Sequence, residues 1–548
     1  MTRRPLRPRF VAFGSSTLLL SGLISGCSSS SGAAESGGST PVQGGTITYA
    51  HVQEPSCIFG GWIQQAYISR QILDGLVTED DNGAIKPWLA TAWTVSPDGL
   101  SYTFTLKSGV KFTDGTPVDA AAIAWNFDLW ENHSGNASAK VSMDPYYKSA
   151  KALDPTHVKI TLNKPFPQFL RLITQGYYGI QSPTAFKSRT RQENCEKPIG
   201  SGAFKVKQWK RGEEVVLVKN PNYTSWPATA KHHGPAIVNE VDWKFVADGV
   251  SRYASLTTGQ ANVVYQVPTS NWTDAQQKYQ PIRFITPGKP VSFNLNTKQG
   301  VFTDKLVRQA FAYGADRKAA VKAGFHGVIP YEGNPALDQA TPDYNAQAAQ
   351  AYPFDQAKAN ALLDRAGWRK GAAGIRTKNG KRLTVRLVYG SGYVLTKEGE
   401  TVLQILQEQW KQTGFEVKLI PATQAEGFSG KYSSPSTYDA TPEYWCNSSP
   451  AVLWIVWRPT TKAAPNYNNE SFYNNDQLAK TIQQANTEQD TAKAGQLYQK
   501  AQQVVQDNAV SIGLYPQTSL YAVAKNLKNV WLEKSQGEPV FSDAYFTK

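Results

Sequence analysis

The side chains that most often carry catalysis are present in this chain, but their spacing forms no catalytic group. The six histidines show no metal-ligand spacing, and the adjacent pair His232-His233 cannot easily bind one ion together. The chain has no G-x-S-x-G nucleophile elbow, no H-E-x-x-H zinc motif and no G-x-x-x-x-G-K-[ST] phosphate loop. We therefore expect no enzyme activity, no metal ion and no cofactor.

Aromatic and amide residues near predicted strand ends are the candidates for ligand binding. One group follows the strand that begins near Asp439 and consists of Trp445, Cys446, Asn447 and Ser448. The other candidates are Phe59, Trp62, Tyr389, Tyr393 and Tyr515. The glycines between Tyr389 and Tyr393 leave backbone N–H groups free for a ligand acceptor. The alternatives are structural: the large aromatics could be core side chains, Asn447 could cap a turn, and the glycine-rich segments could be ordinary loops.

Periodicity predicts a mixed fold. Apolar residues at every second position in Tyr102–Leu106 predict a half-buried strand, and Val118–Trp130 has helical spacing. Segments 383–389, 401–413 and 416–421 predict strand, helix and strand, as in a βαβ unit. Further strands are expected at 46–50, 157–162, 215–218 and 511–515, and further helices at 65–76, 304–315 (with Thr303 as N-cap), 355–366 and 491–505. This pattern predicts α/β layers in at least two lobes.

The N-terminal region has the features of an export signal. Four arginines precede the short apolar stretch 10–24, which leads into Ser25-Gly26-Cys27. An aliphatic residue, two small residues and a cysteine resemble the lipobox of bacterial lipoproteins, in which the cysteine receives a lipid. We expect residues 1–26 to be a lipoprotein signal peptide and residues 27–44, rich in Ser and Gly, to be a flexible tether. The alternative is a plain secretory signal with a chance cysteine.

The net charge of +14 does not by itself indicate nucleic-acid binding. Lys and Arg are scattered among acids with no run of five or more, which is typical of a solvated surface. We expect no nucleic-acid partner. No stretch of 18 apolar residues follows the signal, so the sequence does not predict a transport pore.

Several blocks resemble, in order and spacing, family 5 of the extracellular solute-binding proteins of ABC importers, which includes dipeptide, oligopeptide and nickel binders. Block 93–117 contains WTVSPDG, YTFTL and GVKFTDGTP, and block 198–223 contains PIGSGAF and NPNY. Three shorter matches lie at 293–294 (FN), 307–317 (VRQA and ADR) and 357–368 (AK, LL and AGW). The resemblance spans residues 44–535, nearly all of the expected folded chain.

This resemblance implies an α/β, two-lobed fold like that of periplasmic binding proteins of type II, with an extra subdomain and a hinged cleft. On that pattern, lobe I would consist of residues 45–80, 196–287 and 513–548. An inserted subdomain of lobe I would span residues 81–195, and lobe II would span residues 288–512.

The resemblance also bears on the ligand. In peptide-binding members an acid three residues beyond the strand tryptophan meets the ammonium group of the peptide. Asp439 and Trp445 keep the family spacing, but Ser448 occupies the position of the acid, and Glu443 is interpreted as lying on the wrong side of Trp445. A buried ammonium without an acid is unfavourable. We therefore expect weak binding of free di- and tripeptides and better binding of a neutral, N-modified or otherwise polar solute.

The remaining cysteines fit an exported protein. Beyond Cys27 there are three, so at least one is free or paired with another molecule. Related members carry cysteines in the contexts of Cys57 and Cys195, and the resemblance implies a disulfide between these two, with Cys446 free.

The expected function is that of the substrate-binding lipoprotein of an ABC importer. The protein would capture a small peptide or peptide-like solute and deliver it to the permease subunits. We expect an extracytoplasmic monomer, anchored to the outer face of the cell membrane by a lipid on Cys27. The alternatives are a ligand-sensing lipoprotein, or a binder of another solute such as an oligosaccharide, an opine-like conjugate or a metal chelate.

Overall fold

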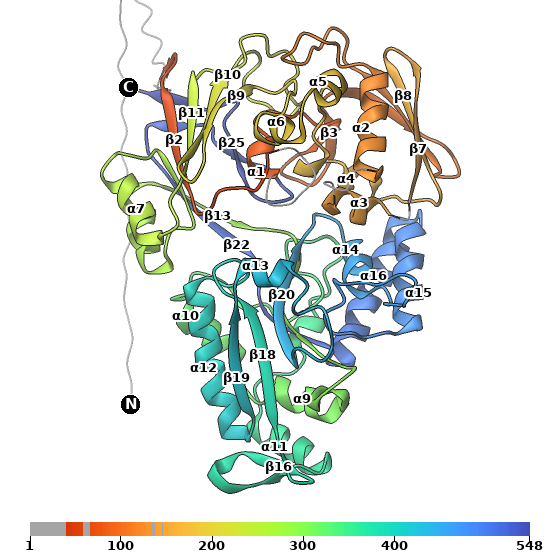
Figure 1. The fold of residues 1–548 in the computed structure, drawn as a ribbon, viewed down its shortest axis with the longest axis vertical. Coiled ribbons are helices and arrows are strands. Elements are labelled where there is room, and N and C mark those ends of the chain that lie inside the picture. The colour runs from red at the N-terminus through yellow and green to blue at the C-terminus, as the bar shows by residue number, and fades with distance from the viewer. Residues whose placement is uncertain (1–39, 59–65, 133–136, 145) are drawn as a thin grey trace, which may run out of the picture. The chain divides into compact units, whose positions relative to one another are not determined.

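The computed structural model describes residues 40–58, 66–132, 137–144 and 146–548, and its largest sheet forms the part that we call lobe I (Figure 1). The strand order is β13 (Gln280–Ile285), β22 (Thr518–Val523), β12 (Val263–Tyr265), β2 (Thr46–His51), β11 (Glu240–Phe245), β10 (Glu214–Lys219) and β9 (Phe204–Lys210). β2 is a central strand and pairs in parallel with β11 and β12. Its alternate residues Ile47 and Tyr49 are fully buried beside Trp243, so the sheet supplies the core of this lobe.

A four-stranded antiparallel sheet forms the inserted subdomain. Its order is β5 (Ala90–Val95), β6 (Ser101–Leu106), β8 (His157–Leu162) and β7 (Tyr147–Asp154). Strand β6 buries every second side chain, as its alternation predicts. Helix α2 (Ala120–Asn132) packs on this sheet and buries Phe127 and Trp130. Shorter helices follow at α3 (Ala137–Met143), α4 (Phe169–Leu172), α5 (Pro183–Ser188) and α6 (Arg191–Glu196).

Cys57 and Cys195 form a disulfide, with their Cα atoms 4.8 Å apart. The backbone N–H of Ile58 also donates to the carbonyl of Cys195, so this junction is held by a covalent bond and a hydrogen bond. The bridge closes the chain around the inserted subdomain. Cys446 is free and buried.

A five-stranded mixed sheet forms lobe II. Its order is β19 (Glu416–Ala422), β18 (Thr384–Gly390), β20 (Ala440–Cys446), β14 (Gly288–Leu295) and β21 (Ser511–Tyr515). β18 and β19 are parallel and are joined by α12 (Lys397–Thr413), which confirms the predicted βαβ unit. Helix α12 buries Leu406 and Trp410 against the sheet and ends at Gly414, whose φ of 96° lies in the left-handed region.

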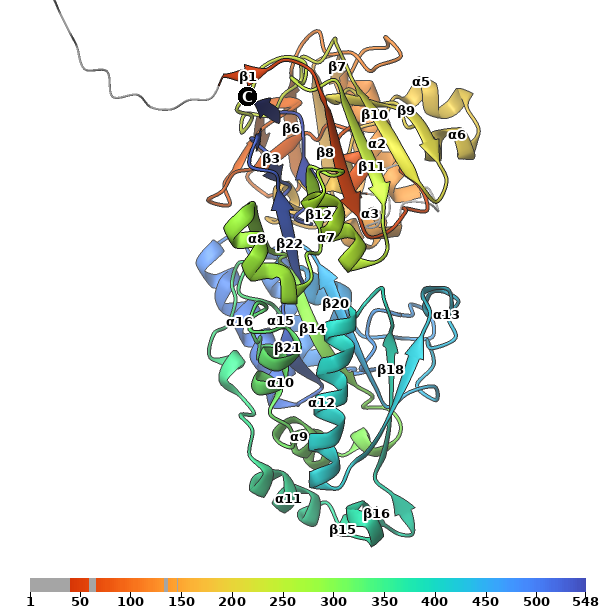
Figure 2. The same cartoon turned by 90° about the vertical axis from the view of Figure 1, so that its left-hand side faces the viewer.

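Other helices complete the two lobes. Lobe I carries α7 (Gly249–Thr257) and α8 (Trp272–Lys278). Lobe II carries α9 (Lys305–Tyr313), α10 (Arg317–Gly324), α11 (Gln356–Arg365), α13 (Gln424–Phe428), α14 (Val452–Trp457), α15 (Asp476–Thr487) and α16 (Thr491–Asp507). In Figure 2, α12 runs along one face of the lobe II sheet, and α13 lies where β18 and β19 end.

Three expectations about boundaries need correction. Strand β1 (Pro41–Val42) pairs with β26 (Tyr545–Thr547), so the tether expected at 27–44 extends too far. Strand β21 stays in the lobe II sheet as far as Tyr515, which moves the expected boundary at 512. Asp304 rather than Thr303 caps α9, because its carboxylate accepts from the N–H of Leu306 at 2.8 Å.

The helix expected at 65–76 is also shorter. Helix α1 covers only Ala66–Ser69. The carbonyl of Gln71 accepts from the N–H of Phe204, and that of Ile72 accepts from Gly202, so strand-like neighbours take the bonds that a longer helix would need. In the part of the chain that the structure describes, no helix is long and apolar enough to cross a membrane.

Candidate functional site

The two lobes are joined by two short crossings. One runs from the end of β13 at Ile285 to the start of β14 at Gly288, and the other runs from the end of β21 at Tyr515 to the start of β22 at Thr518. At the first crossing the backbones are very close: a Cβ on Gly288 would lie 2.0 Å from the carbonyl oxygen of Trp445. Only glycine fits there, and its φ of 138° is also in the region that glycine favours.

Lobe II contains a cavity of about 600 Å³, which we call the lobe II cavity. This volume lies within the range of small-molecule sites. Its polar lining includes Lys289, Asn294, Thr441, Glu443 and Glu470. Its aromatic lining consists of Tyr393, Phe428, Tyr432, Tyr438, Tyr444, Trp445, Tyr467 and Phe472. Aromatic walls with a few polar groups are typical of sites that hold small organic ligands.

Strand alternation brings several of these side chains together. Thr441, Glu443 and Trp445 occupy every second position of β20 and so share one face of the sheet. Glu443 precedes Trp445 in the sequence, whereas the family's acid follows it, but the two side chains lie on the same face. The partner strand β14 pairs Lys289 with Trp445, and Asn294 with Thr441, which places both on the same face.

A β-bulge in β14 makes that pairing possible. The register shifts between Lys289 and Ser292, where Pro290 and Val291 together oppose Tyr444. Beyond the bulge, Val291, Phe293 and Leu295 face the apolar core and are fully buried. In a regular strand of the same residues, without this register shift, Lys289 would alternate onto that core face. The bulge therefore directs a lysine into the lobe II cavity.

The cavity lies at the edge of the sheet where the chain crosses to lobe I. Gly288, the first residue after the crossing, pairs with Cys446 at the end of β20. β18 runs parallel to β20, and β18 and β19 end in Gly390 and Ala422, which both line the cavity. Ligand sites in α/β sheets lie at the carboxyl ends of strands in this way.

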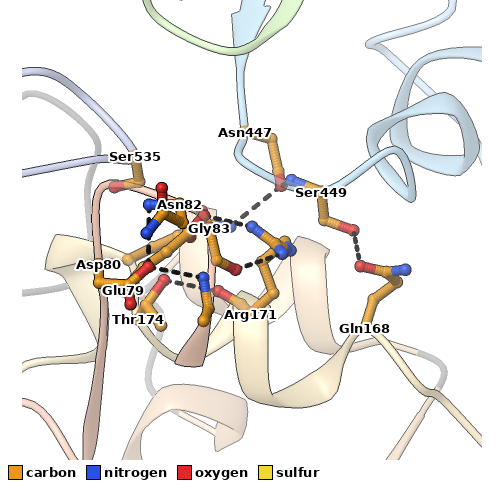
Figure 3. A network of polar contacts seen from close by, with 12 residues as sticks. Glu79, Asp80, Asn82, Gly83, Gln168, Arg171, Thr174, Asn447, Ser449 and Ser535 are labelled. Atoms are coloured by element: carbon orange, nitrogen blue, oxygen red, sulfur yellow. Dashed lines mark hydrogen bonds and ion pairs between the residues drawn. The ribbon is translucent and has the colours of Figure 1, made fainter. Parts of the chain in front are cut away.

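Lobe II also contacts the inserted subdomain directly (Figure 3). The side-chain amide of Gln175 donates to the side-chain oxygen of Asn447 at 3.0 Å, and both residues are buried. The Ser449 hydroxyl donates to Gln168 at 3.4 Å. A third bond joins the Asn486 amide to the hydroxyl of Tyr146 at 2.6 Å. These contacts join lobe II to the inserted subdomain, and the bond of Asn447 lies next to the first crossing.

The structure places the predicted site residues in different surroundings. Tyr393 and Trp445 line the cavity, and Asn447 makes the contact to Gln175. Tyr389 lies against the helix-covered core, because side chains alternate and its neighbour Val388 faces the cavity. Tyr515 also lies in the lobe II core, where it is 5% exposed and packs on Phe325.

The remaining candidates lie near the first crossing or outside the residues that the structure describes. Cys446 is buried, and burial raises the pKa of its thiol. The hydroxyl of Ser448 is buried and has no hydrogen-bond partner among the described residues. Phe59, Trp62 and the proposed lipidation site Cys27 lie outside the described residues. Among the residues that the structure describes, no group of three or more His, Cys, Asp or Glu side chains could hold a metal ion.

Sequence reasoning missed several residues of the cavity, among them Lys289, Asn294, Phe428, Tyr467 and Glu470. They carry no common motif and are spread over 289–470. A charged residue inside an otherwise uncharged strand, as Lys289 is, was the one available signal, because a buried ammonium is unfavourable without a compensating partner.

A comparison with known protein families identifies the class. The model of the bacterial extracellular solute-binding proteins, family 5, matches residues 84–467. The chain belongs to this family. This family 5 protein is 27% identical over 486 residues to the glutathione-binding protein GsiB of Escherichia coli K12, covering 86% of this chain and 88% of GsiB.

Solved structures share the fold of this family 5 protein. NikA from Brucella suis, in complex with Fe(III)-EDTA, aligns with a TM-score of 0.79 at 20% identity, over 92% of this chain and 100% of NikA. The oligopeptide-binding protein AppA from Bacillus subtilis, in complex with a nonapeptide, aligns with a TM-score of 0.77 at 22% identity, over 93% and 100% of the two chains. The two-lobed α/β fold implied by the sequence is thereby confirmed.

Proposed function

We propose that this protein is the substrate-binding component of an ABC importer and captures a small solute where its two lobes meet. The observation that carries the proposal is the lobe II cavity of about 600 Å³, which lies at the edge where the two crossings join the lobes. Two short crossings act as a hinge, because a few residues at element ends can absorb the rotation that closes one lobe on the other.

The solute is proposed to be a peptide or a peptide-like compound. The glutathione-binding relative supports this class, since glutathione is a small peptide derivative. Trp445 and Tyr393 would pack on the solute, and Asn447 with Ser448 would contact it from the crossing edge. Phe59 and Trp62 stay in the proposal as ligand contacts from lobe I.

Delivery would go to the permease subunits of the importer. A lipid on Cys27 would anchor the monomeric protein to the outer face of the cell membrane, and the Ser- and Gly-rich segment after it would give the reach needed to meet the permease. The family consists of solute-binding proteins, in keeping with a role in binding rather than catalysis.

Native mass spectrometry of the protein purified from its own host tests the proposal. The expected result is a bound small molecule that can be released, identified and added back. Small-angle scattering should then show a smaller radius of gyration with the solute than without it. A saturating solute that leaves the radius unchanged contradicts capture by lobe closure. Stable co-purification with a sensor kinase in place of a permease would favour the alternative sensing role.

A further inference from the structure

The charged side chains of the lobe II cavity are two acids and one base. Lys289 lies on β14, Glu443 on β20, and Glu470 on the segment before α15. With all three ionised, the cavity would carry a net charge of −1 inside a protein whose net charge is +14. The net charge of the cavity side chains is thus opposite in sign to the net charge of the whole chain. The acids in the cavity therefore do not simply reflect the overall charge of the protein.

The internal bonds of this group leave carboxylate oxygens available. The ammonium of Lys289 donates to the backbone carbonyl of Glu443 at 2.8 Å rather than to its carboxylate. The amide of Asn294 donates to one oxygen of Glu470 at 2.6 Å. Among the described residues, no side chain donates a hydrogen bond to the Glu443 carboxylate, and no ion pair involves these three residues. The two acids therefore face the cavity with unused acceptors.

Aromatic side chains at the same cavity add a second attraction for positive charge. Phe428 is 64% exposed and Tyr467 is 72% exposed, which is unusual for large apolar side chains. Both line the cavity, as do the half-buried Tyr393 and Trp445. The faces of such rings attract cations, and exposed rings at the opening of a cavity lose unfavourable contact with water when a ligand covers them.

Resting on the proposed function, we infer that the lobe II cavity binds a cationic group of the solute, an alkylammonium or a guanidinium. The group would lie between Glu443 and Glu470, with the aromatic rings around it. While no solute is bound, the ammonium of Lys289 would offset part of the negative charge of the two glutamates. The expectation of a neutral, N-modified or otherwise polar solute rested on Ser448 at the position of the family's acid, whereas this inference rests on the two acids of the lobe II cavity.

The protonation of the group follows from its burial. Burial raises the pKa of Glu443 to about 7 and also raises the pKa of Glu470, while it lowers the pKa of Lys289 to about 8. The tyrosines that face the group, Tyr393, Tyr438 and Tyr444, have raised pKa values and stay neutral at pH 7. Burial therefore favours the protonated form of the two glutamates in the empty cavity, and a bound cation would favour their ionised form and release a proton.

A matched set of probes isolates the charge. N-acetylated tripeptide amides carry no terminal charge, so variants with arginine, citrulline, lysine or norleucine at the central position differ in side-chain charge alone at nearly constant size. Calorimetry would measure their binding to the mature protein and to E443Q, E470Q and a control, E408Q, whose side chain is exposed on α12. The solute recovered from the host would be titrated in the same way.

The expected result is tighter binding of the arginine or lysine probe than of its neutral counterpart, by about tenfold or more. E443Q and E470Q should lose that preference and E408Q should keep it. Titrations in two buffers of different ionisation enthalpy should show proton release with the wild type and less with E443Q.

Two results would overturn the inference while leaving solute capture intact. One is a natural solute without an amine or guanidine group. The other is equal binding of the charged and neutral probes, or variants at positions 443 and 470 that behave as E408Q does. If no probe binds and no solute is recovered, solute capture itself is contradicted, and the inference falls with it.

Discussion

The side-chain amide of Gln175 in the inserted subdomain donates a hydrogen bond to the side-chain oxygen of Asn447 in lobe II, at 3.0 Å. Both residues are buried, at 0% and 2% exposure, so the bond is shielded from water. Asn447 follows directly after the strand that pairs with the first crossing. A contact between lobes at this position stabilises the arrangement in which the lobes meet.

Replacing either partner should therefore favour separation of the lobes. In N447A the Gln175 amide would stay buried without its acceptor, which costs about 1–3 kcal/mol, or roughly five- to hundredfold in the equilibrium. We expect faster solute release and a larger radius of gyration in Q175A and in N447A, measured by stopped-flow fluorescence and small-angle scattering. The double variant should add little to N447A, because the bond to Gln175 is already lost there. Fully additive effects, or an unchanged release rate, would contradict a role for this bond.

Solute affinity should increase from pH 6 to pH 8. The empty cavity holds a proton because the pKa of Glu443 is raised to about 7, whereas a bound cation favours the ionised form. The bound state thus carries fewer protons than the free state, and affinity rises with pH up to the raised pKa, by at most about tenfold per unit. Calorimetry of the recovered solute at pH 6, 7 and 8 measures this slope, which E443Q should flatten.

Protein stability should fall over the same range for a different reason. Burial raises the pKa of Glu538 to about 8, and the nearby Glu533 adds to the rise. Because the folded pKa exceeds the unfolded value of about 4.3, the folded state keeps a proton that the unfolded state releases. Stability is lost as pH rises through this window, by at most about 1.4 kcal/mol per unit.

E538Q should therefore show a weaker decrease in thermal midpoint between pH 6 and pH 8 than the wild type. Calorimetric scans at several pH values provide the measurement. Glu408, exposed on α12, serves as the control site, and E408Q should leave the pH profile unchanged. Parallel profiles for E538Q and the wild type would show that Glu538 is ionised in the folded protein.

The lipid anchor gives a cellular prediction. C27A should abolish lipid attachment and either release the protein into the medium or leave it with its signal uncleaved, because no thiol remains to be acylated. Fractionation and intact-mass measurement distinguish these products from the lipidated form. A C27A protein that is still processed and membrane-bound to the same extent would argue against the lipobox interpretation.

Local patterns were enough to predict much of the fold. Strands β8 and β21 have the predicted limits, because apolar side chains mark each of them within a few residues. Helix α16 begins at Thr491 as expected, since its apolar spacing continues over several turns. The helix expected at 65–76 was wrong beyond Ser69, because the carbonyls of Gln71 and Ile72 bond to segment 202–204, which is distant in the sequence.

The candidate site was less predictable, because it too depends on contacts between segments that are distant in the sequence. Trp445 and Tyr393 are large aromatics at strand ends, and their type and position identified them. Glu443 was set aside because it precedes Trp445, although alternation along β20 was enough to place the two side chains on the same face. Lys289 could not be placed, because its direction depends on a bulge that shows only in the pairing of β14 with β20.

The bulge in β14 also bears on how this protein could diverge. One extra residue between Lys289 and Ser292 decides on which side of the sheet the ammonium emerges. Lys289 and Ser292 share a face although they are three positions apart, so a strand of the same residues without the register shift would carry Lys289 to the apolar side and leave two acids unopposed in the cavity. Relatives with the same amino acids around their cavities could thus differ in preferred solute through the presence of this bulge alone. A comparison of sequences position by position would overlook that difference.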